Sequence, residues 1–169
     1  VNALGTVEGV PITAFLKIAY ALEQNARPLD ISANPAHDGQ GILWYAPLLP
    51  FTPQAVRRYR EIMGEVLARH GFDPLLAVTS RSPRVLSATI PLLFDPANPA
   101  EVARAKACYR DLVSAGLRRG WPPYRLGVDY MDLIGAEEGS EQADLHQRLK
   151  SALDPNNIIA PGRYSGGRH

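Results

Sequence analysis

Cysteine is almost absent from this chain of 169 residues, since Cys108 is the only one. A single cysteine cannot form an internal disulfide, and without a CxxC pair or a His/Cys cluster the sequence offers no metal site. No apolar run approaches the ~20 residues that a membrane-spanning helix requires. The net charge of +1 shows no excess of either sign, so the composition favours neither a nucleic-acid nor a membrane-surface partner. These absences leave a globular domain whose cellular compartment is open.

The composition does support a core, because 46% of the residues are hydrophobic and 169 residues make one ordinary domain. The chain opens at Val1-Asn2-Ala3-Leu4-Gly5, with neither an initiator Met nor a signal peptide. We therefore expect a portion of a longer protein, in which case an activity assigned to the chain belongs to the whole.

The first third of the chain predicts a helix, a loop and a strand. Apolar residues at helical spacing predict a short helix over Phe15–Leu22, and the loop 27–40 is long enough to serve a site. The apolar run 42–49 is typical of a strand covered on both faces. Pro47 and Pro50 place its later half at a sheet edge or beyond the sheet, because proline cannot donate to the ladder.

A long helix and two strands are expected next. Thr52-Pro53 is a good cap for a helix that Gly71 ends. Short apolar segments at 75–79 and 85–94 flank a turn and predict two antiparallel strands, the second interrupted by Pro91.

A second long helix should end at Gly116 or Gly120, and residues 121–128 should return as a strand, with 124–128 in the sheet. The order strand, helix, strand, strand, helix, strand over 41–128 is that of a ferredoxin-like βαββαβ core. The expected fold class is therefore α+β, an antiparallel sheet with both long helices on one face.

The last part of the chain predicts helical structure with a firm stop. Residues 129–139 indicate a short helix and loop, and a helix follows over 140–153. Pro155 fixes its own φ and disfavours the helical conformation at Asp154, so the helix must end there.

The residues after that stop form a restrained turn. Asn156-Asn157 tolerates a tight turn, Ile158-Ile159 is a short apolar run, and Pro161-Gly162 turns the chain again. This order presents Arg163 and Tyr164 from a stiff support, and a guanidinium suits a planar or anionic acceptor. Composition alone supports a second interpretation equally well, in which the segment is only a helix stop followed by a tail that packs on the core.

Four segments carry a family resemblance. Leu153–Tyr164 is similar to a carboxy-terminal Asp-Pro-Asn-Asn-Ile-Ile-Ala-Pro-Gly-Lys/Arg signature, and Trp121–Asp132 to a Trp-x-x-Tyr-Arg segment followed by Met/Gln-Asp. Gly41–Pro47 and the segment from Gly9 to Tyr20 are weaker matches. Together they resemble the vanillyl-alcohol oxidase and para-cresol methylhydroxylase family of flavoproteins. The resemblance implies the carboxy-terminal third of an FAD-dependent oxidoreductase that oxidises para-substituted phenols by hydride transfer.

The resemblance also implies roles for four residues. Tyr124 would hydrogen-bond the phenolic oxygen, and Arg125 would help to hold the phenolate and the flavin ring, because donors and positive charge favour a bound phenolate. Arg163 would lie near the N1 and C2 carbonyl end of the flavin, and Asn157 would be a further cofactor-binding residue. Without the resemblance, the residues favour Tyr124 as a strand-edge core residue and Arg125 as a solvated charge, since adjacent strand residues face opposite ways.

The implied cofactor is FAD, bound non-covalently. Family members that tether the flavin use a histidine or a tyrosine where this chain has Ile42 and Asn34, and His37 is out of register. A Met-His-His segment of some relatives is replaced by Arg84–Ser87, which leaves the exact substrate open. The cofactor would need an amino-terminal FAD-binding domain that the chain does not contain.

The domain assignment that follows is 1–128 as part of a substrate (cap) domain and 129–169 as the carboxy-terminal segment of an FAD-binding domain. The implied partners are a small phenolic substrate, the amino-terminal domain, a cytochrome as electron acceptor and a second copy in a homodimer. Two alternatives stay open: a ferredoxin-like binding or regulatory module without catalysis, and a family flavoenzyme acting on another alcohol or a hydroxy acid.

Overall fold

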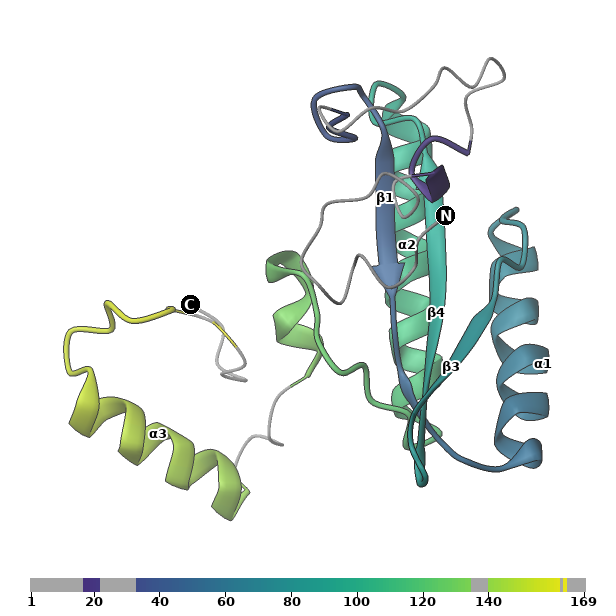
Figure 1. Cartoon of the computed structure of the whole chain (residues 1–169). Coiled ribbons are helices and arrows are strands. Elements are labelled where there is room, and N and C mark those ends of the chain that lie inside the picture. Colours follow the sequence, from purple (N-terminus) through teal and green to yellow (C-terminus); the bar gives the residue numbers. More distant parts are fainter. Residues whose placement is uncertain (1–16, 22–32, 135–139, 162, 164–169) are drawn as a thin grey trace. The chain divides into compact units, whose positions relative to one another are not determined.

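The structure is a computed structural model that describes residues 17–21, 33–134, 140–161 and 163. The chain divides into two compact units, Val1–Trp121 and Pro122–His169, which are described separately (Figure 1). The segment Gly9–Pro11 and Tyr164 lie outside the described residues. Of the helix expected over Phe15–Leu22, residues 17–21 are described and form a short 3-10 turn.

The first unit is built on an antiparallel sheet with β4 at its centre. The strands are β1 (Gly41–Tyr45), β2 (Leu48–Pro50), β3 (Ala77–Ser82) and β4 (Val85–Phe94). β1 and β2 pair with β4 on one side, and β3 pairs with β4 on the other. The fold is α+β with an antiparallel sheet, as the sequence predicts.

Prolines explain two local features of the sheet. β1 and β2 share one unbroken register along β4, and the gap between them falls at Pro47, which accepts from the Ala88 amide at 3.0 Å but has no N–H to return. Pro91, expected to interrupt β4, does not. Backbone groups alternate in direction along a strand, so the missing N–H of Pro91 points to the β3 side, beyond the last β3 pair at Thr89.

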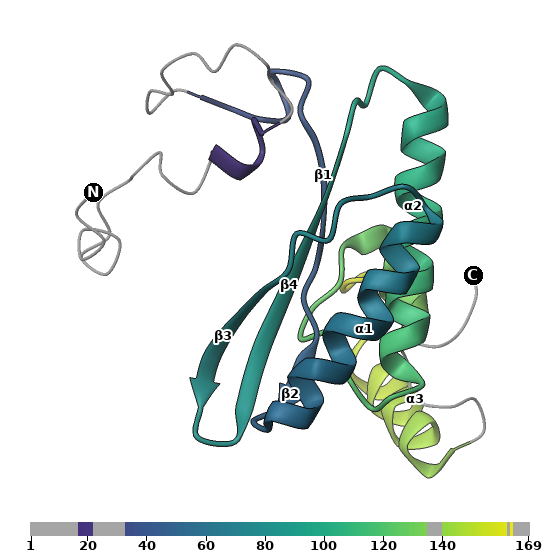
Figure 2. The same ribbon diagram turned by 90° about the vertical axis from the view of Figure 1, so that its right-hand side faces the viewer.

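Two helices cover one face of this sheet, α1 (Pro53–Arg69) and α2 (Pro99–Leu117), as Figure 2 shows from the side. Thr52 Oγ1 caps α1 by accepting from the Ala55 amide at 3.2 Å, which confirms the cap expected from Thr52-Pro53. Asn98 Oδ1 caps α2 from the amides of Ala100 and Glu101. The placement of both long helices on one face agrees with the prediction.

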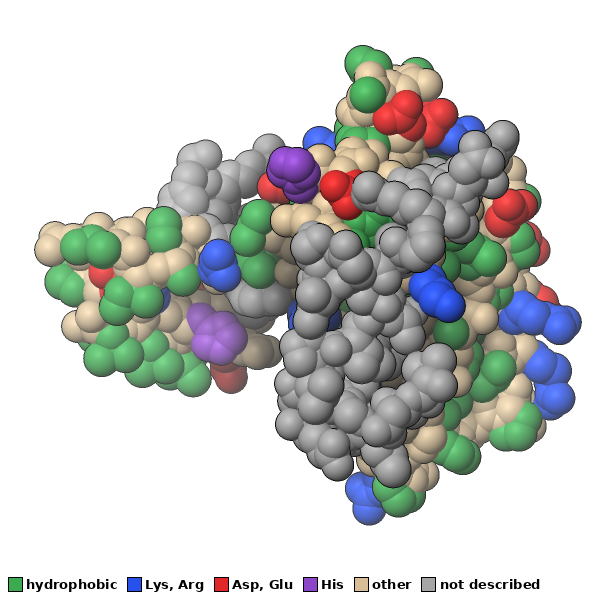
Figure 3. Space-filling view, turned by 45° about the horizontal axis from the view of Figure 1, so that its top comes forward, with side chains coloured by type: hydrophobic (Ala, Val, Ile, Leu, Met, Phe, Trp, Pro, Cys, Tyr) green, Lys and Arg blue, Asp and Glu red, His purple; other side chains and the backbone are tan. Residues whose placement is uncertain are grey.

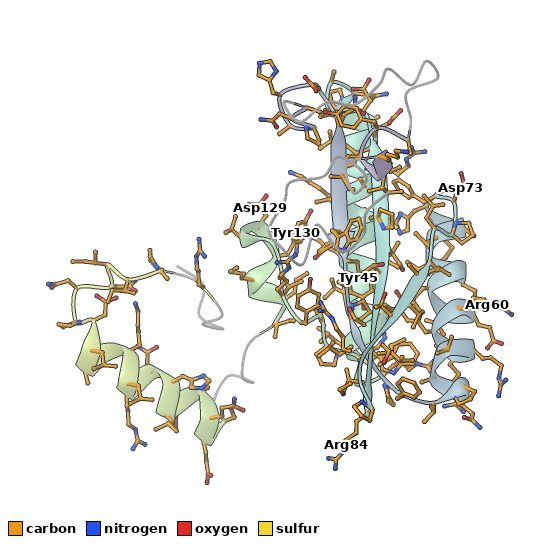
Figure 4. The ribbon with its side chains drawn as sticks, in the orientation of Figure 1. Tyr45, Arg60, Asp73, Arg84, Asp129 and Tyr130 are labelled. Carbon is orange, nitrogen blue, oxygen red and sulfur yellow. The ribbon has the colours of Figure 1, made fainter. Side chains whose placement is uncertain are left out.

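The core of the first unit lies between the sheet and these helices. Tyr45 points into this layer, whereas Arg60 points outward from α1 (Figure 4). The Tyr45 ring meets Tyr109 edge-on at 6.2 Å between centroids, and Tyr59 meets Trp121 at 5.9 Å. Other side chains with almost no exposed surface fill the same layer, namely Leu49, Met63, Leu67, Ile90, Leu92, Cys108, Leu112 and Val113.

Two glycines are required by close approach. A Cβ on Gly41 would lie 2.4 Å from the Phe94 carbonyl oxygen across the strand pair. A Cβ on Gly116 would lie 2.1 Å from the Tyr45 hydroxyl oxygen, because α2 packs directly over that phenol. Neither contact leaves room for a side chain.

The strand expected over 124–128 is absent. Pro123 makes an isolated bridge, and residues 125–127 have no regular structure before a 3-10 helix begins at Val128. Pro122 and Pro123 remove two consecutive N–H donors, which limits the ladder to the single bridge at Pro123. The ferredoxin-like order is therefore incomplete in the described residues, and the remaining strand pairs all involve β4.

The second unit contains the 3-10 helix η3 (Val128–Leu133) and the helix α3 (Glu141–Leu153). Ser140 Oγ caps α3 by accepting from the Ala143 amide at 3.2 Å. α3 has no buried residue, although Tyr130 and Met131 of η3 are buried. The boundary between the units, at 121/122, falls close to the predicted boundary at 128/129, which stays a prediction.

Candidate functional site

The Tyr124–Arg125 pair follows Pro122 and Pro123, the two prolines that begin the second unit. The Arg125 guanidinium carbon lies 5.1 Å from the centre of the Tyr124 ring, within the range of a cation–π contact. Tyr124 is 40% exposed, and Arg125 is exposed as well. Because no strand forms here, the alternation that would have sent the two side chains to opposite faces does not apply. The two side chains lie together.

Asn157 and Arg163 lie in the turn that follows α3. Asn157 and Ala160 both have left-handed backbone conformations, with φ of 51° and 45°. Asparagine tolerates this region, but for alanine it costs about 1–2 kcal/mol, so the surrounding contacts must hold the turn in place. The Arg163 amide donates to the Ala160 carbonyl at 3.2 Å, and the Arg163 side chain is exposed.

A hydrogen-bond cluster centred on Asp154 supplies those contacts. Asp154 is only 8% exposed, and its Oδ1 and Oδ2 accept from the amides of Ile158 and Ile159 at 2.9 and 2.8 Å. Lys150 Nζ donates both to Asp154 Oδ2 and to the Ile159 carbonyl. The hydrogen bond from Lys150, followed by those from the two amides, holds the pKa of the Asp154 carboxyl below its usual range.

Asp154 and Lys150 are not among the residues that the sequence pattern singled out. Their spacing of four residues at the end of α3 is a usable signal, because a lysine one turn before an aspartate can pair with it on the same helix face. The two backbone amides that complete the cluster have no signal in the sequence.

Exposed apolar side chains on α3 and the turn after it make up an apolar stripe, and Figure 3 shows hydrophobic side chains over this part of the surface. The exposed fractions of its five residues lie between 51% and 79%, and the residues are Leu145, Leu149, Leu153, Ile158 and Ile159. The three leucines recur every four residues and form one helix face. Exposed large apolar side chains gathered on one segment are typical of an interaction site.

The cysteine and two histidines of the described residues are less suited to a catalytic role than the residues above. Burial raises the pKa of the Cys108 thiol to about 11, so the thiolate is disfavoured near neutral pH. His37 is exposed and lies 3.6 Å from the Asp38 carboxylate, and His70 Nε2 lies 2.8 Å from Asp111 Oδ2, where it joins α1 to α2. Within the described ranges, no group of three or more His, Cys, Asp or Glu residues could hold a metal ion. Nor is any described helix long and apolar enough to cross a membrane.

Comparison with known proteins gives this arrangement a family. The family described as "FAD linked oxidases, C-terminal domain" matches residues 88–164, a range that includes Tyr124, Arg125, Asn157 and Arg163. The 1'-carboxy-chondrochloren decarboxylase of Chondromyces crocatus is 33% identical over 156 residues, which cover 92% of this chain and 28% of that protein. The 4-cresol dehydrogenase [hydroxylating] flavoprotein subunit of Pseudomonas putida is 32% identical over 125 residues, covering 74% of this chain and 24% of that protein.

A solved structure agrees with these matches. The 4-ethylphenol oxidase of Gulosibacter chungangensis, determined as an isoeugenol complex, superposes with a TM-score of 0.63 and 26% identity, covering 76% of this chain and 25% of that one. The chain thus spans about a quarter of the length of the relatives that it matches.

The fold and the matches define a carboxy-terminal domain of FAD-linked oxidoreductases. Within that class, the chain belongs to the vanillyl-alcohol oxidase and para-cresol methylhydroxylase family, as a carboxy-terminal portion of such an enzyme.

Proposed function

We propose that the chain is the carboxy-terminal part of an FAD-dependent enzyme that oxidises a para-substituted phenol by hydride transfer. The observation that carries this proposal is the contact between Tyr124 and Arg125, in which the guanidinium lies over the phenol ring and both residues are exposed. Two of the relatives are named for 4-cresol and 4-ethylphenol, which are para-substituted phenols.

The proposed roles follow from the chemistry of the two side chains. Oxidation of a para-alkyl phenol at its benzylic carbon is easier from the phenolate, because the anionic oxygen supports the positive charge that develops as hydride leaves. The Tyr124 hydroxyl would donate to that oxygen, and Arg125 would supply positive charge beside it. The pair would thus bind the phenolate and raise the rate of the step that follows.

Flavin, when bound, supplies the hydride acceptor. The turn after α3 fits this group: it offers the Arg163 guanidinium and the Asn157 amide beside the exposed apolar side chains of Ile158 and Ile159. A flavin ring has apolar faces and a polar edge of carbonyl oxygens, which such a set can meet. In this proposal Arg163 faces that edge and Asn157 assists it, while Tyr124 and Arg125 hold the substrate.

The apolar stripe of α3 supports a second part of the proposal, that this segment packs on an FAD-binding domain. Leu145, Leu149 and Leu153 are exposed, because a single helix cannot bury its own apolar face. The matched relatives are about four times as long as this chain. Packing five such side chains against another domain would remove apolar surface from water. The chain purified alone should therefore be colourless and bind FAD weakly.

We propose non-covalent binding of the flavin. Ile42 has no nucleophile, and Asn34 uses its Oδ1 to accept from the His37 amide at 3.4 Å. Acid precipitation of the flavin-loaded enzyme should leave the flavin in the supernatant, and flavin that stays with the protein would contradict this part.

Tyr124→Phe tests the central proposal, with Tyr59→Phe as a matched control in the core of the first unit. In the flavin-loaded enzyme, losing one donor to the phenolate oxygen disfavours the ionised substrate and should slow anaerobic flavin reduction by a para-alkyl phenol about 10²–10³-fold. Tyr59→Phe should leave that rate unchanged. Equal rates for both variants would remove Tyr124 from the site and favour a binding module.

A second candidate function is decarboxylation of a carboxylated substrate, because a relative named as a decarboxylase aligns with 92% of this chain. Arg125 suits a carboxylate as well as a phenolate. Carbon dioxide release from a carboxylated phenol, compared with flavin reduction by the same phenol without its carboxyl group, separates the two candidates.

A further inference from the structure

The carboxylate of Asp154 is buried and held by several hydrogen bonds. It accepts from the Ile158 and Ile159 amides and from Lys150 Nζ, and it is almost fully removed from solvent. Three donors on one carboxylate exceed what ending a helix requires, because the Asp154 amide itself closes α3 by donating to the Lys150 carbonyl at 2.8 Å.

The same contacts determine the path of the turn as far as Arg163. The carboxylate fixes the amides of Ile158 and Ile159, and Lys150 fixes the Ile159 carbonyl, so the backbone on both sides of Ile159 is held. Ala160 follows in the left-handed conformation, and its carbonyl accepts from the Arg163 amide. These contacts connect the end of α3 to Ile159, and the carbonyl of the next residue, Ala160, holds the Arg163 amide.

We propose that Asp154, together with Lys150, is a positioning residue that sets the placement of Arg163 and Asn157 toward the flavin. This inference rests on the proposed function. Asp154 touches neither substrate nor cofactor in this proposal, and it acts only through the turn that it holds. Its carboxylate is suited to the task because it is acceptor-only when ionised, whereas an amide of the same shape is not.

The first test uses the 169-residue chain itself and needs no flavin. Asp154→Asn keeps the shape, but both carboxylate oxygens face donors, so either orientation of the new amide places its NH₂ group against an N–H. Hydrogen exchange of the Ile158 and Ile159 amides, followed by NMR, should accelerate about 10- to 100-fold. Asp129→Asn makes the same chemical change at an exposed position of η3 and should leave both rates unchanged. Unchanged exchange in Asp154→Asn overturns the inference.

Lys150→Met provides a second variant in case Asp154→Asn prevents folding of the segment. It removes one donor to Asp154 and the contact to the Ile159 carbonyl but leaves the carboxylate to hold both amides. The expected acceleration is smaller than in Asp154→Asn, and Lys150→Arg should restore part of the protection. If Lys150→Met and Lys150→Arg both exchange like the unaltered chain, Lys150 has no part in holding the turn and the inference is overturned.

The second test asks whether the turn acts through Arg163, using flavin affinity in the flavin-loaded enzyme. Arg163→Ala should weaken binding about 10- to 100-fold, as expected for loss of a charged hydrogen-bond donor. Asp154→Asn should weaken it by a similar factor, and the double variant should be weaker than Arg163→Ala alone by much less than that factor, because only the Asn157 contact remains to be lost. Strictly multiplicative effects would show that Asp154 acts independently of Arg163 and overturn the inference.

The outcomes separate this inference from the function on which it rests. If Arg163→Ala leaves flavin affinity unchanged, the proposed flavin contact is wrong and the inference falls with it. If Arg163→Ala weakens binding and Asp154→Asn does not, the proposed function stands and only the positioning role of Asp154 fails.

Discussion

The two units of this chain are stabilised in different ways. The first is held by burial: Tyr45, Met63 and Leu67 have essentially no exposed surface, and two helices cover one face of the sheet. In the second, α3 buries none of its residues, and polar contacts around Asp154 hold the turn that follows. In α3 and the turn after it, apolar side chains are exposed and the Asp154 carboxylate is buried. Such an arrangement is typical of a segment that packs against another surface. The first unit therefore has a buried core of its own, whereas α3 and the turn after it leave their large apolar side chains exposed.

Removing buried volume from the first unit should have the largest effect. Met63→Ala deletes a fully buried side chain from α1 and leaves a cavity, so the free energy of unfolding should fall by about 2–5 kcal/mol. Leu149→Ala, the matched change on α3, should alter it by less than ~0.5 kcal/mol in this chain. Urea denaturation of both variants measures the difference. Similar losses would show that α3 belongs to the same packed core, which breaks the comparison.

Adding volume to the first unit should have the next largest effect. Gly116→Ala places a methyl group 2.1 Å from the Tyr45 hydroxyl oxygen, and the rigid, buried phenol has little room to move. We expect a loss of about 1–3 kcal/mol in the free energy of unfolding. Combining it with Tyr45→Phe removes the clashing oxygen and should recover most of that loss. A double variant as unstable as Gly116→Ala would show that the clash lies elsewhere, with the Trp121 carbonyl at 3.1 Å as the remaining contact.

The Tyr45 hydroxyl itself should cost stability. Among the described residues it has no hydrogen-bond partner, and burial raises its pKa well above the ordinary value. Because phenylalanine keeps the ring and removes a buried polar group without a partner, Tyr45→Phe should raise the free energy of unfolding by about 1 kcal/mol. Thermal and urea denaturation check the sign, and a destabilised Tyr45→Phe would mean that the hydroxyl is satisfied.

The smallest effect on the whole chain is acid sensitivity of the turn after α3. The pKa of Asp154 is lowered from 3.8 in the folded state, chiefly by the hydrogen bond from Lys150, so its contribution to stability is present above pH 3.8 and is lost as the pH falls through the lower native value. The amide signals of Ile158 and Ile159 should therefore shift in acid below pH 3.8, while those of β4 stay unchanged until the first unit unfolds. Shifts that begin well above that pH would contradict a stabilised carboxylate.

Local sequence was a sufficient guide wherever one residue type dictates the backbone. Thr52-Pro53 starts α1 and Pro155 follows the end of α3 as expected, because capping and proline geometry act within a few residues. The strands expected over 42–49 and 85–94 could also be located, since an apolar run between turn residues is typical of a strand. The family resemblance, carried by short motifs, is confirmed by the comparisons.

Expectations failed where the outcome depended on partners in space. Residues 124–128 have the composition of a strand, but Pro122 and Pro123 remove the donors that a neighbour would need, and Trp121 packs on Tyr59 instead. β3 begins at Ala77 and continues to Ser82 through an irregular register, although the strand was expected over 75–79.

By itself, the sequence determined the helix ends, the α+β class, the order of the two long helices and the flavoenzyme family, because these follow from local backbone chemistry and short motifs. Only the tertiary structure decided that β4 is the central strand, that Arg125 stacks on Tyr124, and that the Asp154 carboxylate binds two backbone amides. Those three features depend on which groups meet after folding. The partners of Arg125 and Asp154 lie within five residues along the chain, so the backbone path between them, which the residue types alone do not specify, sets those two contacts.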